Sequence, residues 1–271
     1  DLHSFPTRRS SDLHIVGTSR CPEFTTDERQ CAALEQLRRR DINALIVIGG
    51  NGSQSGAHAL AQRGMTVLGI ASTIDNDLLG TDVSIGSTTA LDTAMEAIDR
   101  LRVTAASHRR VFLVEVMGRH SGYLAAVVAI AGGAEAIVVP EVDTPPEVIA
   151  KQLQASHQRG KSHAIVVVAE GARHGVDALS SYFRDHQQQL GLDLRITRLG
   201  HVQRGGAPGV YDRMLATRLG AAAIEALLAA DTGVLVGLRR GAIAMTPLDE
   251  VAAGTAPLDL QLLHLAQELA T

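Results

Sequence analysis

The sequence predicts an α/β fold with a largely parallel sheet. Two observations predict it: from residue 41 onward, short β-branched apolar runs alternate with longer helical stretches, and the runs are nearly continuous in valine, isoleucine and leucine. Continuous apolar runs are typical of strands that are buried on both faces, as in parallel sheets covered by helices. Strands that take turns with helices form βαβ units, in which neighbouring strands are parallel.

Seven segments have the strand pattern, and six stretches between them have helical character. The strands are predicted at residues 44–49, 66–70, 111–116, 136–140, 163–169, 194–199 and 233–238. The helices are predicted at residues 53–63, 87–102, 122–131, 145–159, 177–190 and 211–229. In open parallel sheets, ligands bind at the carboxyl ends of the strands, so the residues that follow each strand are the candidates for function.

Polar, glycine-rich sequences follow five of the predicted strands. They are GGNGSQSG after the first strand, ASTIDND after the second, MGRHSG after the third, EGAR after the fifth and GHVQRGG after the sixth. Glycines let the backbone approach a ligand closely, and a helix that starts after such a turn presents unpaired N–H groups to an anion. Five such turns predict a site for phosphate or sugar.

The composition argues against several classes of function. The chain has 271 residues, of which 45% are hydrophobic and 20% charged, with a net charge of −4 and two cysteines. The charge gives no reason to expect a nucleic-acid partner, and no apolar run is long and clean enough to cross a bilayer. The two cysteines form neither a disulfide framework nor a metal-ligand pattern, so we expect a cytoplasmic protein without membrane contact.

The TIDND sequence, residues 73–77, admits two interpretations. Its carboxylates, Asp75 and Asp77, follow a hydroxyl within a turn, so one acid could remove a hydroxyl proton while the other holds a charge or a metal. The same residue types also form Asx turns and cap helices, here the helix predicted from Ser87. GGNGS, residues 49–53, is likewise either a phosphate site or a plain tight turn, because it lacks the lysine of a Walker A loop.

Basic residues follow the later strands. Arg204 precedes two glycines in HVQRGG, at a predicted strand-to-helix turn where a guanidinium can bind a phosphate through two parallel hydrogen bonds. His201 could donate to the same anion or satisfy a hydrogen bond in the core. For other arginines, such as Arg109, solvent exposure is the alternative.

Together, TIDND, MGR and GHVQRGG at these separations resemble the ATP-type phosphofructokinase family, from GTSRCPEF (residues 17–24) to the C-terminus. The resemblance implies transfer of the γ-phosphoryl group of ATP to the 1-hydroxyl of fructose 6-phosphate, with Mg²⁺, in glycolysis. It also implies two three-layer lobes, each a mostly parallel sheet flanked by helices, with the active site between the lobes. The nucleotide lobe would hold residues 15–86 and 200–257. The sugar-phosphate lobe would hold residues 87–199 and 258–271.

The resemblance implies roles for residues at matching positions. Catalysis would fall to the base that takes the sugar hydroxyl proton and to its neighbours: Asp75, Thr73, Asp77 and Arg119. Sugar and 6-phosphate would be held by Arg110, Met117, Gly118, Glu170, Arg195, His201 and Arg204. The nucleotide would contact Arg20, Cys21, Gly50, Gly52 and Ser53. Arg110 would reach across from a neighbouring subunit, so we expect a homotetramer or at least a dimer.

Two departures from the family pattern concern the metal and the phosphoryl donor. Asn51 stands in place of the aspartate of GGDGS, so the metal ligands would be Asn51 and Asp77, and an amide brings no charge to Mg²⁺. Ser72 stands where ATP users often have glycine and pyrophosphate users typically carry lysine. Gly52 also fits ATP users, since pyrophosphate users tend to have a second aspartate there. Both positions favour ATP as the donor.

A third departure lies at the N-terminus. DLHSFPTRRSSDL stands where family members have a strand and a GGDxPGxN nucleotide loop, and we expect residues 1–14 to be non-native or disordered. We therefore expect the chain to fold imperfectly there and to be weakly active or inactive.

Two other functions compete with an ATP-dependent kinase. A pyrophosphate-dependent phosphofructokinase would use another donor, and a non-catalytic sugar-phosphate-binding paralogue would keep the arginines without the nucleotide loop. Four charged residues also resemble the family's effector pocket at a subunit interface, which would make the enzyme allosteric: Arg102, Glu135, Arg159 and Lys161. Solvated surface charges are the alternative for these four.

Overall fold

The computed structural model describes residues 21–270, which divide into two compact units between Ile42 and Asn43. The first unit contains the 3₁₀ helix η1 (Pro22–Thr25) and the helix α1 (Asp27–Arg38), which the sequence analysis did not predict. The Thr26 side chain caps α1 by accepting a hydrogen bond from a backbone N–H of its first turn. The predictions for residues 1–14 and for Arg20 fall outside the described residues.

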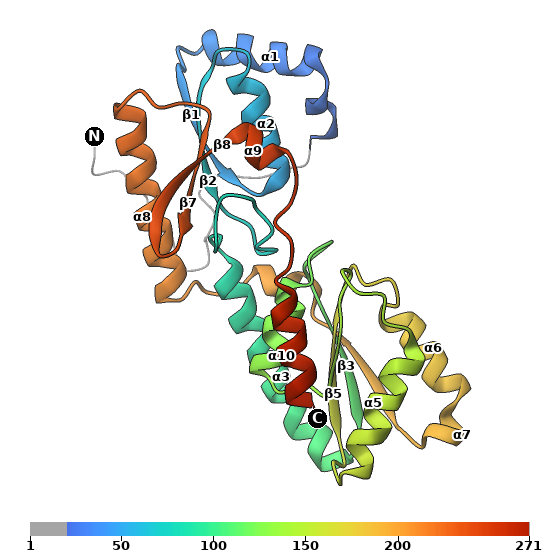
Figure 1. Ribbon diagram of the computed structural model, residues 1–271. Coiled ribbons are helices and arrows are strands. Elements are labelled where there is room, and N and C mark those ends of the chain that lie inside the picture. The colour runs from blue at the N-terminus through green and yellow to red at the C-terminus, as the bar shows by residue number, and fades with distance from the viewer. Residues whose placement is uncertain (1–20, 271) are drawn as a thin grey trace. The chain divides into compact units, whose positions relative to one another are not determined.

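The second unit contains two four-stranded sheets (Figure 1). The first sheet has the order β1-β2-β7-β8, with strands Ala44–Gly49, Thr66–Ala71, Val234–Arg239 and Ala242–Pro247. The second has the order β4-β5-β3-β6, with strands Ala136–Val138, Ala164–Ala169, Val111–Val116 and Leu194–Arg198. All neighbouring strands are parallel except β7 and β8. The predicted α/β fold with mostly parallel sheets is therefore confirmed.

The helices of this unit lie between its strands or follow its last strand. They are α2 (Asn51–Ala61), α3 (Ser87–His108), α4 (Tyr123–Ala131), α5 (Pro146–Gln158), α6 (Val176–Asp185), α7 (Gln187–Leu190), η2 (Gly200–Arg204), α8 (Val210–Leu228), α9 (Leu248–Ala252) and α10 (Leu260–Ala270). The single helix predicted at 177–190 is wrong, because the chain breaks at His186 into α6 and α7. The ring of His186 stacks on Tyr182, with ring centroids 4.2 Å apart, and its Nδ1 lies 2.8 Å from the Tyr182 carbonyl oxygen.

The alternation of side chains along β3 and β5 explains the layers of the second sheet. Phe112, Val114 and Val116 of β3 pack with α3, α4 and α10, whereas Val111 and Leu113 pack with α5 and α6. Figure 1 shows α3 and α10 on one side of these strands, and α5 and α6 on the other. The strands are buried on both faces because successive side chains of a strand point to opposite sides.

Two edge strands, β1 and β6, do not follow the prediction of burial on both faces. β1 is only partly buried, and Ile48 is 64% exposed. β6 is also largely exposed, at Arg195 and Ile196 among others. An apolar run alone does not distinguish a central strand from an edge strand, because that depends on which strands pair on both sides.

The strand β8 was missed because its hairpin lacks a strong sequence signal. β7 and β8 are joined by Arg240 and Gly241, which adopt φ angles of 51° and 77°. Such two-residue turns favour Asn-Gly or Asp-Gly, since both central residues have positive φ. Arg240 occupies the first of these two positions, so the sequence lacks the residue type that predicts such a turn.

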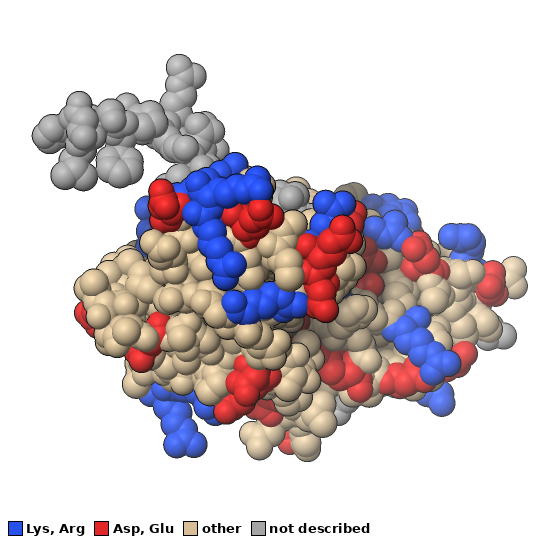
Figure 2. Space-filling view, turned by 90° about the horizontal axis from the view of Figure 1, so that it is seen from above, with Lys and Arg blue, Asp and Glu red and all other residues tan. Residues whose placement is uncertain are grey.

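The molecular surface carries charges of both signs. Figure 2 shows one face of the molecule, on which acidic and basic side chains lie among one another. Within residues 21–270, no helix is both long and apolar enough to cross a membrane.

Candidate active site

Internal hydrogen bonds fix the loop between β2 and α3, which carries the TIDND sequence. Asn76 has a φ of 50°, and its Oδ1 accepts a hydrogen bond from the backbone N–H of Ser84 at 2.8 Å. Ser84 is fully buried, and its hydroxyl donates to the carbonyl oxygen of Thr73 at 2.6 Å. The loop therefore holds Asp75 and Asp77 on either side of an asparagine that is itself fixed.

Charges from four segments act on the carboxyl group of Asp75. Burial raises the pKa of Asp75 above its ordinary value, and the carboxylates of Asp77 and Glu170 raise it further, whereas Arg119 and Arg204 lower it. The segments that follow β2, β3, β5 and β6 therefore lie within electrostatic reach of one carboxyl group. A partly buried acid with a raised pKa, surrounded by specific charges, is typical of functional sites.

Asp77 and Asn51 together offer oxygen atoms to a cation. Burial raises the pKa of Asp77, and the Asn51 side chain lowers it. Asn51 Nδ2 donates to the Asp77 carbonyl oxygen at 3.4 Å, which leaves Asn51 Oδ1 buried and without a hydrogen-bond partner among the described residues. An unpaired buried oxygen beside a carboxylate fits a hydrated Mg²⁺ ion.

The protein supplies few ligands for such an ion. Across residues 21–270, no three His, Cys, Asp or Glu residues are grouped so that they could hold a metal. Mg²⁺ is commonly bound through one or two carboxylates together with phosphate oxygens of the substrate, which is compatible with a small protein ligand set.

The GGNGS turn lies against the TIDND loop. A Cβ atom on Gly50 would lie 3.1 Å from Thr73 Cβ, so these two backbones approach closely. The helix α2 begins at Asn51, two residues earlier than predicted, and therefore includes Gly52 and Ser53 in its first turn. A Cβ on Gly52 would meet no atom within 4 Å, so the space beside it is open. The N-terminus of α2 is thus placed where an anion near Asp77 could reach it.

The MGR segment turns sharply where it leaves β3. Gly118 has a φ of 142°, and a Cβ there would lie 2.4 Å from the Ser121 carbonyl oxygen, so only glycine fits. The backbone N–H of Arg119 donates to Glu170 Oε1 at 2.8 Å. A Cβ on Gly171 would lie 1.7 Å from the Arg119 carbonyl oxygen. These contacts join the ends of β3 and β5 into one surface of backbone and carboxylate groups.

The HVQR turn contributes exposed basic side chains. η2 follows β6, and its residues His201 and Arg204 are exposed, whereas Gln203 between them is 1% exposed. Gln203 Oε1 accepts a hydrogen bond from the backbone N–H of Met117 at 2.7 Å. The turn that carries Arg204 is therefore bonded directly to the MGR segment.

Two predicted substrate-binding arginines lie elsewhere on this chain. Arg110 precedes β3, and its Nε donates to Asp193 Oδ2 at 2.8 Å; Arg195 pairs with the same carboxylate. This pair lies at the amino end of β3, which is about 20 Å from Met117 at roughly 3.3 Å per residue. The chain does not bring Arg110 and Arg195 together with Arg204. Cys21 belongs to the first unit, where it is exposed and its thiol contacts Glu23 Oε2 at 3.5 Å.

Sequence analysis missed two residues that hold the site together. These are Gln203, which lies within HVQRGG but received no role there, and Asp212. Asp212 is 2% exposed, and its carboxylate accepts from the N–H groups of Gly86 and Thr89 at 2.9 and 2.8 Å. It thus caps α3 from α8. The partners of Asp212 are more than 120 positions away in the chain, so no local pattern could have revealed the contact.

The charged residues that resemble an effector pocket are partly engaged in structural contacts. Lys161 Nζ lies 3.4 Å from Glu135 Oε1, and Glu135 Oε2 accepts from the backbone N–H of Ile165 at 2.7 Å. Arg102 Nη2 donates to the Gly133 carbonyl oxygen at 3.4 Å. Glu135 is 8% exposed, so this carboxylate fixes the start of β5 as well as pairing with lysine.

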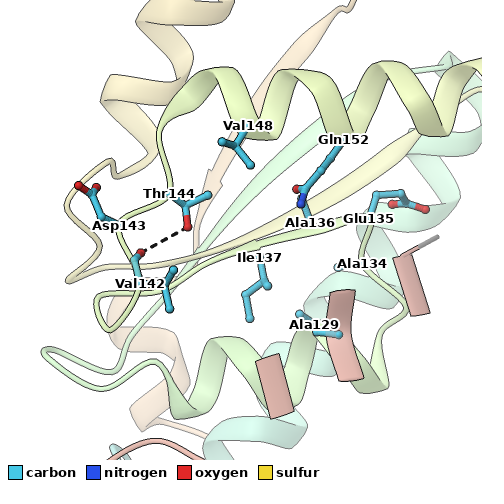
Figure 3. A pocket seen from close by; sticks show the side chains of 11 residues that line it. Ala129, Ala134, Glu135, Ala136, Ile137, Val142, Asp143, Thr144, Val148 and Gln152 are labelled. Atoms are coloured by element: carbon cyan, nitrogen blue, oxygen red, sulfur yellow. Dashed lines mark hydrogen bonds between the residues drawn. The ribbon is translucent and has the colours of Figure 1, made fainter. Parts of the chain in front are cut away.

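Two surface cavities, of about 170 and 200 Å³, flank the edge strand β4. Figure 3 shows the first of them, with Ile137, Val142 and Gln152 around it and Glu135 at one end. None of the predicted catalytic residues lines either cavity. The site at the strand ends is therefore identified by its charges and hydrogen bonds, not by a closed cavity.

Comparisons with known proteins identify the family of this chain. Residues 9–227 match the family model described as Phosphofructokinase. The chain is 50% identical over 258 residues to ATP-dependent 6-phosphofructokinase 1 of Thermus thermophilus, covering 94% of this chain and 79% of that protein. It is 45% identical over 255 residues to the ATP-dependent 6-phosphofructokinase of Halalkalibacterium halodurans, again covering 94% and 79%.

Solved structures of the same family have the same fold. The structure of Pichia pastoris phosphofructokinase in the T-state superposes with a TM-score of 0.80 at 38% identity, covering 89% of this chain and 28% of that longer chain. A pyrophosphate-dependent phosphofructokinase from Marinobacter aquaeolei superposes with a TM-score of 0.76 at 24% identity, covering 90% and 71%, which bears on the fold alone. The family match, the curated relatives and the charged site at the strand ends lead to one conclusion: this chain belongs to the phosphofructokinase family.

Proposed function

We propose that this protein transfers the γ-phosphoryl group of ATP to the 1-hydroxyl of fructose 6-phosphate. The observation that carries the proposal is the carboxyl group of Asp75, whose pKa is raised by burial and which lies within electrostatic reach of Arg119 and Arg204. A raised pKa brings a carboxylate closer to the value that suits a general base, and the arginines suit the charge of a phosphoryl group. Relatives named ATP-dependent 6-phosphofructokinase support the same reaction.

In this proposal, the residues of the site position the substrates and stabilise the charge of the phosphoryl group, and none of them forms a covalent bond to the substrate. Asp75 takes the proton of the 1-hydroxyl as its oxygen attacks the γ-phosphorus, the bond from the γ-phosphorus to the bridging oxygen of the β-phosphate breaks, and ADP leaves. Arg119 stabilises the equatorial phosphoryl oxygens. Met117, Gly118 and Glu170 hold the sugar hydroxyls. Asn51 and Asp77 would hold Mg²⁺, and the bound ion would supply positive charge to neutralise the transferring phosphoryl group.

The phosphoryl donor is proposed to be ATP because of two positions beside the TIDND loop. Ser72 is not lysine, and the open space at Gly52 in the first turn of α2 leaves room for the nucleotide phosphates beside Gly50 and Ser53. We assign the sheet β1-β2-β7-β8 to a nucleotide lobe of residues 15–86 and 200–257, and the sheet β4-β5-β3-β6 to a sugar-phosphate lobe of residues 87–199 and 258–271.

The quaternary arrangement is also a proposal. Arg110 and Arg195 share Asp193 at the amino end of β3, so they are better placed to reach the 6-phosphate of a neighbouring subunit than that of their own. A homotetramer, or at least a dimer, would bring them to the HVQR turn of a partner. The cluster of Arg102, Glu135, Arg159 and Lys161 would then be a candidate effector site of a cytoplasmic, allosteric enzyme.

A donor-exchange assay tests the proposed reaction. With fructose 6-phosphate and Mg²⁺, we expect slow formation of fructose 1,6-bisphosphate with ATP and none above background with pyrophosphate. Product formation only with pyrophosphate would support the pyrophosphate-dependent alternative. Calorimetric binding of fructose 6-phosphate without ATP binding or turnover would support a non-catalytic sugar-phosphate-binding protein.

Replacing Asn51 with aspartate should strengthen metal binding. The buried Oδ1 of Asn51 has no hydrogen-bond partner among the described residues, so a carboxylate at this position would add charge where the amide adds none. We expect the Mg²⁺ concentration for half-maximal activity to fall several-fold, with the KM for fructose 6-phosphate unchanged. An unchanged or higher Mg²⁺ requirement would show that Asn51 does not face the metal.

A further inference from the structure

We propose that Gln203 is a positioning residue, which fixes the MGR segment (Met117–Arg119) to the HVQR turn (His201–Arg204). This inference rests on the proposed function, because it concerns how two parts of one sugar-phosphate site are kept in register. Through Gln203, the group that binds the 6-phosphate sets the position of the backbone that holds the sugar hydroxyls. The 1-hydroxyl is thereby held at a fixed place relative to Asp75.

The contact between the two segments is buried and direct. Gln203 is 1% exposed, Met117 is 5% exposed, and the distance from Met117 N to Gln203 Oε1 is 2.7 Å. Met117 is the first residue after β3, so its N–H lies beyond the last residue of the strand. A buried N–H group without a partner destabilises a protein, so the chain is held to the geometry in which Gln203 Oε1 accepts the hydrogen bond.

The secondary structure of the HVQR turn links this bond to the basic side chains. η2 is a 3₁₀ helix, in which residues three apart lie on the same side. His201 and Arg204 therefore share one side of the turn and are exposed, while Gln203 points inward. A shift of the turn that moves Arg204 must also move the acceptor of the Met117 N–H.

The other end of the turn is fixed against α3. A Cβ on Gly206 would lie 2.5 Å from Thr93 Oγ1 and 2.9 Å from Thr89 Cγ2, so the backbone passes close to this helix. Thr89 is also the residue whose N–H donates to Asp212. The turn thus lies between α3 on one side and the end of β3 on the other. Gln203 provides the attachment to the end of β3.

The methionine variant Gln203→Met removes the acceptor while keeping a side chain of similar length. We expect the KM for fructose 6-phosphate to rise at least tenfold and kcat to fall, with the KM for ATP within twofold of wild type. Gln152→Met is the matched control: it makes the same change in α5, where Gln152 Oε1 is buried but, unlike Gln203 Oε1, has no hydrogen-bond partner among the described residues. This variant should leave both KM values unchanged. Equal changes in the two KM values, or no change, would overturn the proposal.

Hydrogen exchange at Met117 tests the coupling without requiring turnover. In wild type, fructose 6-phosphate should slow exchange of the Met117 N–H; in Gln203→Met, that N–H should exchange faster and gain little protection from the ligand. Equal protection in both proteins would contradict the coupling. If the methionine variant does not fold, Gln203→Asn replaces it, because the asparagine side chain is one methylene shorter and its amide oxygen lies farther from the Met117 N–H. A wild type that binds fructose 6-phosphate without phosphorylating it would refute the proposed function, while the exchange result would still decide the role of Gln203.

Discussion

Replacing Asp75 with serine is expected to abolish turnover while leaving the binding of fructose 6-phosphate largely in place. The serine removes the proposed base, and general base catalysis contributes about 10²- to 10⁴-fold to a rate. The arginines that would hold the 6-phosphate do not depend on this carboxyl group. A coupled assay should therefore show kcat lowered by at least about 10²-fold, and calorimetry should show sugar-phosphate binding close to wild type.

The matched control is Asp231→Ser, which makes the same change at an exposed position after α8. This variant should have wild-type kinetics. Near-normal turnover by Asp75→Ser would remove Asp75 from the mechanism, and a complete loss of sugar-phosphate binding would indicate that its role is structural.

The raised pKa of Asp75 predicts two pH effects, one on the activity of wild type and one on the stability of Asp75→Ser. In wild type, kcat/KM should fall as the pH is lowered through the raised pKa, which lies above the ordinary aspartate value of about 3.9, because the protonated acid cannot accept a proton. The folded state binds this proton more tightly than the unfolded state does, so the carboxyl group lowers stability increasingly as the pH rises through its pKa. Asp75→Ser should therefore gain melting temperature relative to wild type at neutral pH, and this gain should diminish below about pH 4. A gain that is independent of pH would contradict this origin.

Arg204→Gln is expected to weaken fructose 6-phosphate binding selectively. A hydrogen bond to a charged group contributes about 1.5–3 kcal/mol, so the KM for fructose 6-phosphate should rise about 10- to 100-fold, whereas the KM for ATP stays near wild type. The loss of a nearby positive charge should also raise the pKa of Asp75 further, which would shift the acid limb of the pH profile to higher pH.

Arg100→Gln is the control for Arg204→Gln. Arg100 lies on the exposed surface of α3, where it pairs with Glu96, and its substitution should leave both KM values and the pH profile unchanged. If Arg204→Gln changed the KM for ATP as strongly as that for fructose 6-phosphate, the assignment of Arg204 to the 6-phosphate would be wrong.

The sequence predicted the strands well because their signal is local. Valine, isoleucine and leucine runs marked β2, β3 and β5, which are buried on both faces, and the polar segments that follow them were found without a structure. The sequence did not reveal β8 because its turn has arginine where asparagine or aspartate would be expected. It did not reveal the break between α6 and α7 because no glycine or proline marks it; the ring of His186 at the break stacks on Tyr182. Neither feature is encoded in apolar periodicity.

The sequence by itself determined the class of fold, the five polar turns and the residue types of the site. Tertiary structure decided which of these residues act on one another. It set Asp75 among the charges of Asp77, Arg119, Glu170 and Arg204, and it placed Arg110 and Arg195 at the opposite end of β3. It also revealed Gln203 and Asp212, since a buried hydrogen bond between distant segments depends on how the sheets and helices pack, and this packing leaves no periodic trace along the chain.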